Sequence, residues 1–278
     1  TQEHLFLSII ELSMNVRKNI WNIVLVLVLL AAAYLRLSAL DYTTLGTGEV
    51  EVYQAANDYA SGNILKSFYI FDTPPLIKYM GAFVLLTAGF SETALRMIPV
   101  IFGMLTVILT WFFAKKFYSK KVAMLAVVMV AFSFIHLQFS RSLQMEAMLG
   151  FFFLLALYYF FDFVENRKKN HLMFGAAIAL GMLTKFMMLY AVAIIIIISI
   201  LRHYIQIRRK PQFSIIIDNF LVKSFIVAVV LFFVIWPHAL MPLKTDITIS
   251  VDFADGPHVN HITPSIPQLL LELGKRSV

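Results

Sequence analysis

The sequence of 278 residues contains no cysteine and few charged residues. Without cysteine the chain has no disulfide, no thiolate metal ligand and no thiol nucleophile. Charged residues make up 14% of the chain, whereas a soluble domain carries about 25%. Hydrophobic residues make up 60%, and the mean hydropathy is +0.81. So few charges cannot cover so much apolar surface in water, which excludes a soluble enzyme or a nucleic-acid-binding domain. The composition predicts an all-α, polytopic integral membrane protein.

Long apolar runs predict about seven transmembrane helices, because a helix needs roughly 20 mostly apolar residues to cross a bilayer. The predicted spans are 20–40, 97–114, 122–140, 146–164, 171–184, 186–201 and 219–237. The run 171–201 is too long for one ordinary span, and Thr184-Lys185 interrupts it, which predicts a pair of short helices. Residues 1–19 carry apolar side chains at helical spacing and predict an amphipathic interfacial helix.

The scarce charges indicate the orientation, since Lys and Arg are enriched in cytoplasmic loops. The basic clusters are Arg17-Lys18, 115–121, 167–169 and 202–210. All of them fall on one side if segment 76–90 lies in the interface and does not cross. This predicts an N-terminus inside, with the loop 41–96 and the tail 239–278 outside. The membrane would be the plasma membrane, or that of the endoplasmic reticulum in a eukaryote. The net charge of +7 then reflects cytoplasmic loops and not nucleic acid.

The predicted outer loop gathers acidic residues and contains a helical segment, EVEVYQAANDYASG, which follows Gly48 and ends at Gly62. On a helix, Val52, Ala56 and Tyr59 share one face, which favours a helix lying flat on the membrane. The alternative is a surface helix whose acidic side chains are simply solvated.

Ionisable residues also flank the predicted membrane segments. Asp72 and Lys78 lie on either side of a Pro-Pro pair, which makes a rigid turn. Arg141 and Glu146 lie at the outer ends of two spans, where such residues are costly and are commonly paired or functional. The alternative is that Arg141 snorkels and Glu146 is its structural partner. Arg36, near the end of the first span, is expected to snorkel or to pair with an acidic loop residue.

The order of these features resembles the membrane glycosyltransferases of the GT-C fold, in particular the protein O-mannosyltransferase and lipid A aminoarabinose transferase group. The segments that carry the resemblance, in chain order, are the acidic loop motif, the Pro-Pro-Leu turn, SETALRMIPVIFGMLTVILTWFFAKKFYSKK, FSRSLQMEAMLGFFFLLALYYF and GAAIALGMLTKFMMLYAV. The resemblance covers about residues 20–240. It implies a GT-C-like transmembrane module at 20–238, with interfacial helices in its first outer loop.

The resemblance implies that a sugar moves from a polyprenyl-phosphate carrier to a hydroxyl acceptor on the outer face. Such a reaction needs a carboxylate near the acceptor hydroxyl and cations near the phosphate that leaves. The candidate catalytic residues are Glu49, Glu51, Asp72 and Glu146. The candidate substrate-binding residues are Tyr53, Pro74, Pro75, Lys78, Arg96, Arg141 and Lys185. The expected partners are membrane lipid and the lipid-linked sugar, and no nucleic acid. No metal ligands are assigned, although a divalent cation near the acidic loop suits a phosphate leaving group.

Two departures from the family pattern favour an alternative. The motif expected as Asp-Glu reads Gly48-Glu49, and glycine has no carboxylate. The chain also ends soon after its last predicted span. The alternative is a catalytically inactive, GT-C-like structural or lipid-binding subunit of a larger membrane complex, or one half of a split enzyme. A transporter would also use charges at membrane depth, but the sequence shows no inverted repeat.

Overall fold

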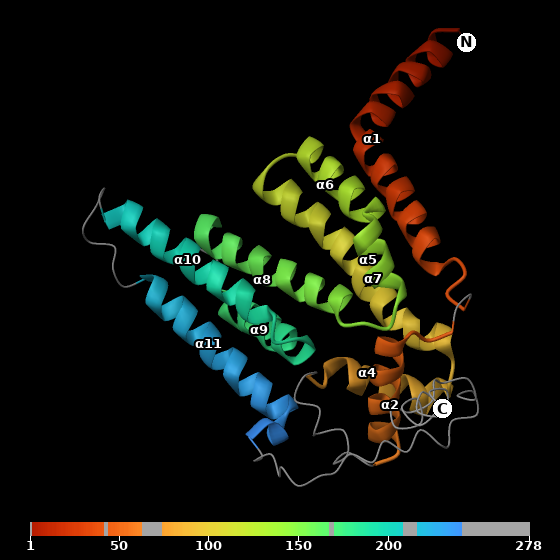
Figure 1. Cartoon of the computed structure of the whole chain (residues 1–278). Coiled ribbons are helices and arrows are strands. Elements are labelled where there is room, and N and C mark those ends of the chain that lie inside the picture. The colour runs from red at the N-terminus through yellow and green to blue at the C-terminus, as the bar shows by residue number, and fades with distance from the viewer. Residues whose placement is uncertain (1, 42–43, 63–73, 167–169, 208–215, 241–278) are drawn as a thin grey trace, which may run out of the picture. The chain divides into compact units, whose positions relative to one another are not determined.

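The computed structural model describes residues 2–41, 44–62, 74–166, 170–207 and 216–240. All regular structure in these ranges is helical, which confirms the predicted all-α class. The helices, labelled in Figure 1, are α1 (Gln2–Leu37), α2 (Thr47–Ala60), α4 (Leu76–Ala88), α5 (Glu92–Phe117), α6 (Lys120–Phe132), α7 (Phe134–Arg141), α8 (Glu146–Asn166), α9 (His171–Thr184), α10 (Met188–Ile207), α11 (Ile216–Ile235) and the short 3-10 helix η1 (Pro237–Leu240). The predicted tail lies outside the described residues from residue 241 onward.

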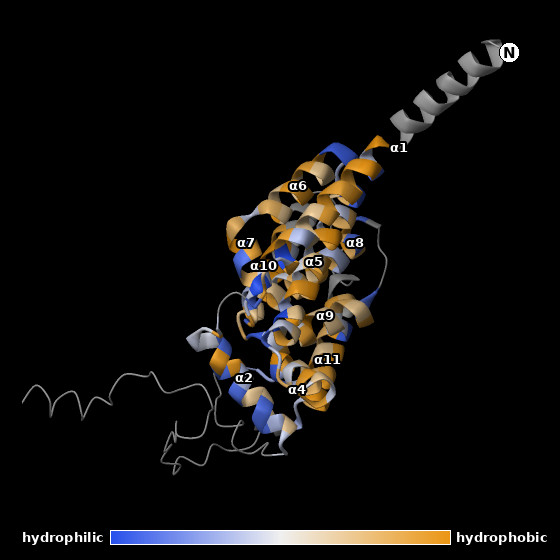
Figure 2. Ribbon diagram, turned by 90° about the vertical axis from the view of Figure 1, so that its right-hand side faces the viewer, coloured by the Kyte–Doolittle hydropathy of each residue, from blue (hydrophilic) through white to orange (hydrophobic). Residues whose placement is uncertain are grey.

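Several helices are long and apolar enough to cross a membrane, which confirms a membrane protein. Within the described ranges these are Ile20–Leu37 of α1, all of α5 and Glu146–Glu165 of α8, with α6 and α7 together as a fourth, bent candidate. Helices α4, α9, α10 and α11 supply shorter apolar stretches. The 14 residues of α9 extend about 21 Å, which is less than the roughly 30 Å hydrocarbon core. Figure 2 shows the apolar colouring that runs along α5 and α6. The number of about seven spans stays a prediction.

Two predicted helix boundaries have different outcomes. The break at Thr184-Lys185 is confirmed, because α9 ends at Thr184 and α10 begins at Met188. By contrast, α1 continues from Gln2 to Leu37, so the boundary predicted after residue 19 falls within one helix. The interfacial position of the first residues stays a prediction.

The prediction of one continuous helix over 122–140 is wrong, because α6 and α7 meet at Ser133 with a bend of 56°. The Ser133 hydroxyl caps α7 by accepting a hydrogen bond from the His136 amide at 3.4 Å. Arg36 donates to the Ala131 carbonyl, at the C-terminal end of α6, at 3.2 Å. Arg36 therefore does not snorkel, and it pairs with no acid in the described part of the loop. It is fully buried and satisfies a helix end left open by the bend.

Three clusters of buried apolar side chains hold the helices together. One joins α8, α9, α10 and α11, a second joins α1, α5 and α6, and a third joins α2, α4, α5 and the start of α8. The third cluster includes α2, whose predicted helix is confirmed and whose Val52 and Ala56 are buried. That apolar face packs on α4: a Cβ added at Gly81 would lie 2.8 Å from the Ala56 Cβ, so glycine permits the close approach. The face predicted to rest on the membrane is therefore covered by another helix.

Candidate functional site

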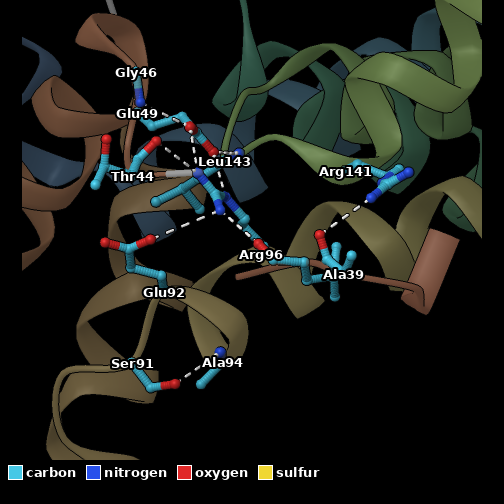
Figure 3. A network of polar contacts seen from close by, with 11 residues as sticks. Ala39, Thr44, Gly46, Glu49, Ser91, Glu92, Ala94, Arg96, Arg141 and Leu143 are labelled. Atoms are coloured by element: carbon cyan, nitrogen blue, oxygen red, sulfur yellow. Dashed lines mark hydrogen bonds and ion pairs between the residues drawn. The ribbon is translucent and has the colours of Figure 1, made fainter. Parts of the chain in front are cut away.

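A buried ion pair between Glu49 and Arg96 lies at the centre of the polar network in Figure 3. Arg96 donates from Nε to Glu49 Oε1 and from Nη2 to Oε2, both at 2.9 Å. Oε1 also accepts from the Leu143 amide at 2.7 Å, and Oε2 accepts from the Gly46 amide at 2.9 Å. A carboxylate offers about four lone-pair sites, so these bonds fill its capacity to accept.

The same two side chains join four segments that are far apart in the sequence. Glu49 lies in the first turn of α2, where its bond to Gly46 closes the start of the helix. Arg96 comes from α5 and also donates to the carbonyl oxygens of Leu40 at 2.5 Å and Thr44 at 3.2 Å. Leu143 lies in the connection between α7 and α8. We call this set of hydrogen-bonded residues the Glu49–Arg96 clasp; its members are Glu49, Arg96, Leu40, Thr44, Gly46 and Leu143.

The clasp revises the roles predicted for Glu49 and Arg96. Burial alone would raise the pKa of the Glu49 carboxyl, but the hydrogen bonds from Arg96, Leu143 and Gly46 outweigh burial and lower that pKa below its ordinary value. A general base needs a free lone pair and a pKa near the working pH. The Glu49 carboxylate has neither, and the Arg96 guanidinium is already engaged. This geometry favours a positioning role for both side chains, and their assignment as base and phosphate ligand stays a prediction.

Glu146 and Lys185 were predicted as separate site residues, and the structure brings them together. Glu146 begins α8 and Lys185 follows α9, and Lys185 Nζ lies 2.9 Å from Glu146 Oε1. Each side chain keeps 32% of its surface exposed. The pair therefore remains open to a ligand from outside, unlike the buried clasp.

Lys78 lies in the first turn of α4, directly after the buried Pro74 and Pro75. Only 3% of Lys78 is exposed, and among the described residues no carboxylate lies within 4.0 Å of its amine. Burial lowers the pKa of this amine to about 8. The N-terminus of a helix also carries a partial positive charge. A buried cation beside a helix N-terminus, with no carboxylate partner in the described chain, is suited to receive an anion.

Lys78 and Glu146 border the same apolar cluster. Ile77, next to Lys78, and Met145, next to Glu146, are both buried members of the third cluster. Leu180 of α9 packs on that cluster, and α4 contacts α9 directly. The third cluster thus connects the regions that hold Lys78, Glu146 and Lys185.

The other predicted residues lie elsewhere or remain undescribed. Glu51 is exposed on α2, and the Tyr53 ring packs edge-on against Phe90 with 5.0 Å between centroids. Asp72 lies outside the described residues. Gly48, at the position of the expected aspartate, is exposed, and a Cβ built there would lie 3.5 Å from Gln144 Nε2. Over the described ranges no three His, Asp or Glu side chains gather as metal ligands would, and a bound cation stays untested.

Arg141 lies on a different helix from Lys78. It ends α7, which packs on α1, α5, α6 and α8, whereas α4 packs on α2, α5 and α9. Arg141 Nη2 donates to the Ser38 carbonyl at 2.6 Å and the Ala39 carbonyl at 3.2 Å, at the end of α1. The guanidinium lines a pocket of about 300 Å³. Arg141 thus makes its described hydrogen bonds to the end of α1, and Arg96 lines the same pocket.

One buried ionisable pair was not predicted from the sequence. Lys116 Nζ of α5 lies 2.8 Å from Asp162 Oδ1 of α8 and 3.1 Å from the Tyr158 hydroxyl. The Asp162 side chain is 4% exposed. A single carboxylate inside a predicted span is itself a signal, because it requires a partner at membrane depth. By contrast, nothing in the sequence indicated that Gln144 lies beside Gly48, because that contact depends on the tertiary fold.

These features define a helical membrane protein with ionisable groups gathered where helices end. Residues 72–238, more than half of the chain, match the family described as dolichyl-phosphate-mannose-protein mannosyltransferase. The chain belongs to this family of GT-C glycosyltransferases, which confirms the resemblance inferred from its motifs. No curated protein matches the chain. The matched region contains Lys78, Arg96, Glu146 and Lys185, and Glu49 precedes it.

Proposed function

We propose that this protein transfers a sugar from a polyprenyl-phosphate donor to a hydroxyl acceptor, with Lys78 and Lys185 beside the phosphate and Glu146 as the base. The description of the family names mannose on dolichyl phosphate as donor and a protein as acceptor, which favours mannose and a serine or threonine hydroxyl here. The single observation that carries the proposal is the buried Lys78 amine, which has no carboxylate partner in the described chain.

The state of Lys78 favours an anionic ligand. A buried ammonium without an anion is costly, and binding of a phosphate would compensate that cost. The Pro74-Pro75 turn and the start of α4 restrict the backbone from which the Lys78 side chain extends. Because the pKa of the free amine is about 8, it is charged at neutral pH before the ligand binds.

The reaction follows from these roles. The acceptor oxygen forms a bond to the anomeric carbon while the bond from that carbon to the phosphate oxygen breaks. The phosphate keeps the electron pair, and the cations Lys78 and Lys185 stabilise its charge. The acceptor proton passes to the Glu146 carboxylate. Glu51, which is exposed, and Asp72 are the other carboxylates to compare with Glu146 as the base.

The membrane orientation belongs to the same proposal. The basic clusters favour an N-terminus inside, and this supports a reaction on the outer face of the plasma membrane or in the lumen of the endoplasmic reticulum. No described contact requires a metal ion for the steps above, and the use of a divalent cation is decided by adding and removing it in the transfer assay.

Binding of polyprenyl phosphate to the purified full chain tests the role of Lys78. We expect wild-type protein to bind polyprenyl phosphate more tightly than polyprenol, and the Lys78→Gln variant to lose about tenfold or more of that preference. Lys120→Gln removes an exposed cation and serves as the matched control. Transfer of labelled mannose to a serine- and threonine-containing peptide then tests the reaction. Equal binding of both lipids by wild type would overturn the proposal.

The inactive subunit is the second candidate, and it rests on a specific observation. Gly48 lacks the expected carboxylate, and the neighbouring Glu49 cannot replace it because its four accepting sites are filled. This candidate predicts donor binding without transfer, and stable purification together with other membrane proteins. Transfer by the purified chain alone would exclude it.

A further inference from the structure

The pocket beside Arg141 holds a positive charge that the proposed reaction does not use. It lies between the end of α1, α7 and the clasp. Its lining residues are Ala39, Leu40, Glu49, Arg96, Phe134, Leu137, Gln138, Arg141 and Ser142. Glu49 and Arg96 neutralise each other at 2.9 Å, so Arg141 supplies the net charge of the lining.

The Arg141 guanidinium is held in place and only partly engaged. Nη2 donates to the Ser38 and Ala39 carbonyls, which fixes its orientation. Ala39 has a φ of 51°, an uncommon backbone state for a residue with a Cβ, and this turn directs the two carbonyl groups to Arg141. Within the described chain, Arg141 Nε and Nη1 have no hydrogen-bond partner, and no carboxylate lies within 4.0 Å of the group. Three of the five N–H donors are therefore available to a ligand.

The rest of the pocket favours an amphipathic ligand over a free ion. Gln138 is exposed and adds a neutral amide to the lining. Phe134 lines the pocket and is 76% exposed, and next to it Ile135 is 65% exposed. On α1, Tyr34 is 71% exposed. If a lipid phosphate binds at Arg141, its acyl chains can therefore lie against the apolar surfaces of α7 and α1.

We propose that this pocket binds the phosphate of a membrane phospholipid, at a site separate from the one assigned to the polyprenyl-phosphate donor. Arg recognises phosphate through paired N–H donors, and the available donors of Arg141 can bind it in this way. The acyl chains lie along α7 and the end of α1. The inference stands independently of the transfer reaction, since it uses neither Lys78 nor Glu146.

Native mass spectrometry of the full chain in a phosphate-free detergent tests the site. The probe is phosphatidylglycerol, and diacylglycerol with the same acyl chains is the control without phosphate. We expect phosphatidylglycerol to bind, and Arg141→Gln to weaken its binding about tenfold to a hundredfold. Gln138→Glu adds a negative charge at an exposed position and leaves the Arg141 bonds to α1 in place, so it should weaken binding even if Arg141→Gln does not fold. Lys120→Gln, which removes an exposed cation on α6, should bind as wild type.

Competition distinguishes the two lipid phosphates. We expect Lys78→Gln to retain phosphatidylglycerol, and polyprenyl phosphate not to displace phosphatidylglycerol from wild type. The proposal is overturned if Gln138→Glu binds phosphatidylglycerol as wild type does, or if diacylglycerol binds equally well. It is also overturned if polyprenyl phosphate takes the place of phosphatidylglycerol in an Arg141-dependent manner, because the pocket would then be the donor site.

Discussion

Replacement of Glu49 by glutamine should destabilise the protein, and the clasp gives the magnitude. The carboxylate accepts hydrogen bonds from Arg96 twice, from Leu143 and from Gly46. A glutamine amide has one accepting oxygen, and its NH₂ group would face two of these donors. Each buried donor left without an acceptor costs about 1–3 kcal/mol, and Arg96 keeps a buried charge without its partner. Breaking one side of a buried pair costs about 3–5 kcal/mol in total.

The assay is thermal unfolding of the purified protein in one detergent. For a chain of this size, about 3–5 kcal/mol corresponds to a fall in the unfolding midpoint of roughly 6 to 20 °C. Glu51→Gln makes the same chemical change at an exposed position of α2, and it should leave the stability within about 0.5 kcal/mol of wild type. Joint replacement of Glu49 and Arg96 by methionine removes both charges and should cost less than the sum of the single changes.

Unfolding of Glu49→Gln at the same temperature as Glu51→Gln would contradict this prediction. The carboxylate would then not be the tether that the geometry indicates, and a direct chemical role for Glu49 would be restored. An activity assay alone cannot separate these cases, because both predict loss of transfer. The unfolding midpoint separates them, and it should be measured before any loss of activity is assigned to chemistry.

Three further predictions follow from the site. Glu146→Gln should abolish transfer. It should change the stability by only about 0–1 kcal/mol, because the side chains of the pair with Lys185 are 32% exposed. A large fall in the unfolding midpoint would instead indicate a structural role for Glu146. Gly48→Asp should increase the rate of transfer, because position 48 is exposed and an added Cβ would lie at an ordinary 3.5 Å from Gln144 Nε2. Gly48→Ala is the control, and no gain in rate would mean that the base lies elsewhere. Affinity for polyprenyl phosphate should fall as the pH rises above about 8, because the free Lys78 amine then loses its charge. Lys78→Arg should remove this pH dependence up to pH 10. An unchanged pH profile of affinity in that variant would show that another group titrates.

The helices were predictable because their cause is local. Apolar runs of sufficient length predict helices in a membrane without any knowledge of their neighbours. The interruption at Thr184-Lys185 was visible for the same reason, and so was the helix of the first loop. The bend at Ser133 was not predicted. The Ala131 carbonyl beside it accepts a hydrogen bond from Arg36, which lies 95 residues earlier in the chain, and this contact cannot be inferred from the run 122–140 alone.

The partners of the charged side chains were only partly predictable, since pairing depends on the tertiary fold. The types and approximate positions of Glu146 and Lys185 were apparent, but their contact at 2.9 Å follows from the packing of α8 on α9. Glu49 shows the opposite case. Its place in an acidic motif favours a catalytic role, whereas four hydrogen bonds from its neighbours occupy the accepting sites of its carboxylate.

The neighbouring positions 48 and 49 therefore need separate explanations. Residue 49 is buried and bound by four donors, so a carboxylate there serves the fold whether or not the protein is active. Residue 48 is exposed and beside Gln144, so a side chain there has room and is not needed for the hydrogen bonds of the clasp. Loss of the side chain at Gly48 thus costs the fold little, while the clasp keeps the loop before Glu146 in place. Under the proposed function, a chain with this pair of residues would take its base from Glu146, with Glu51 and Asp72 as the carboxylates to compare.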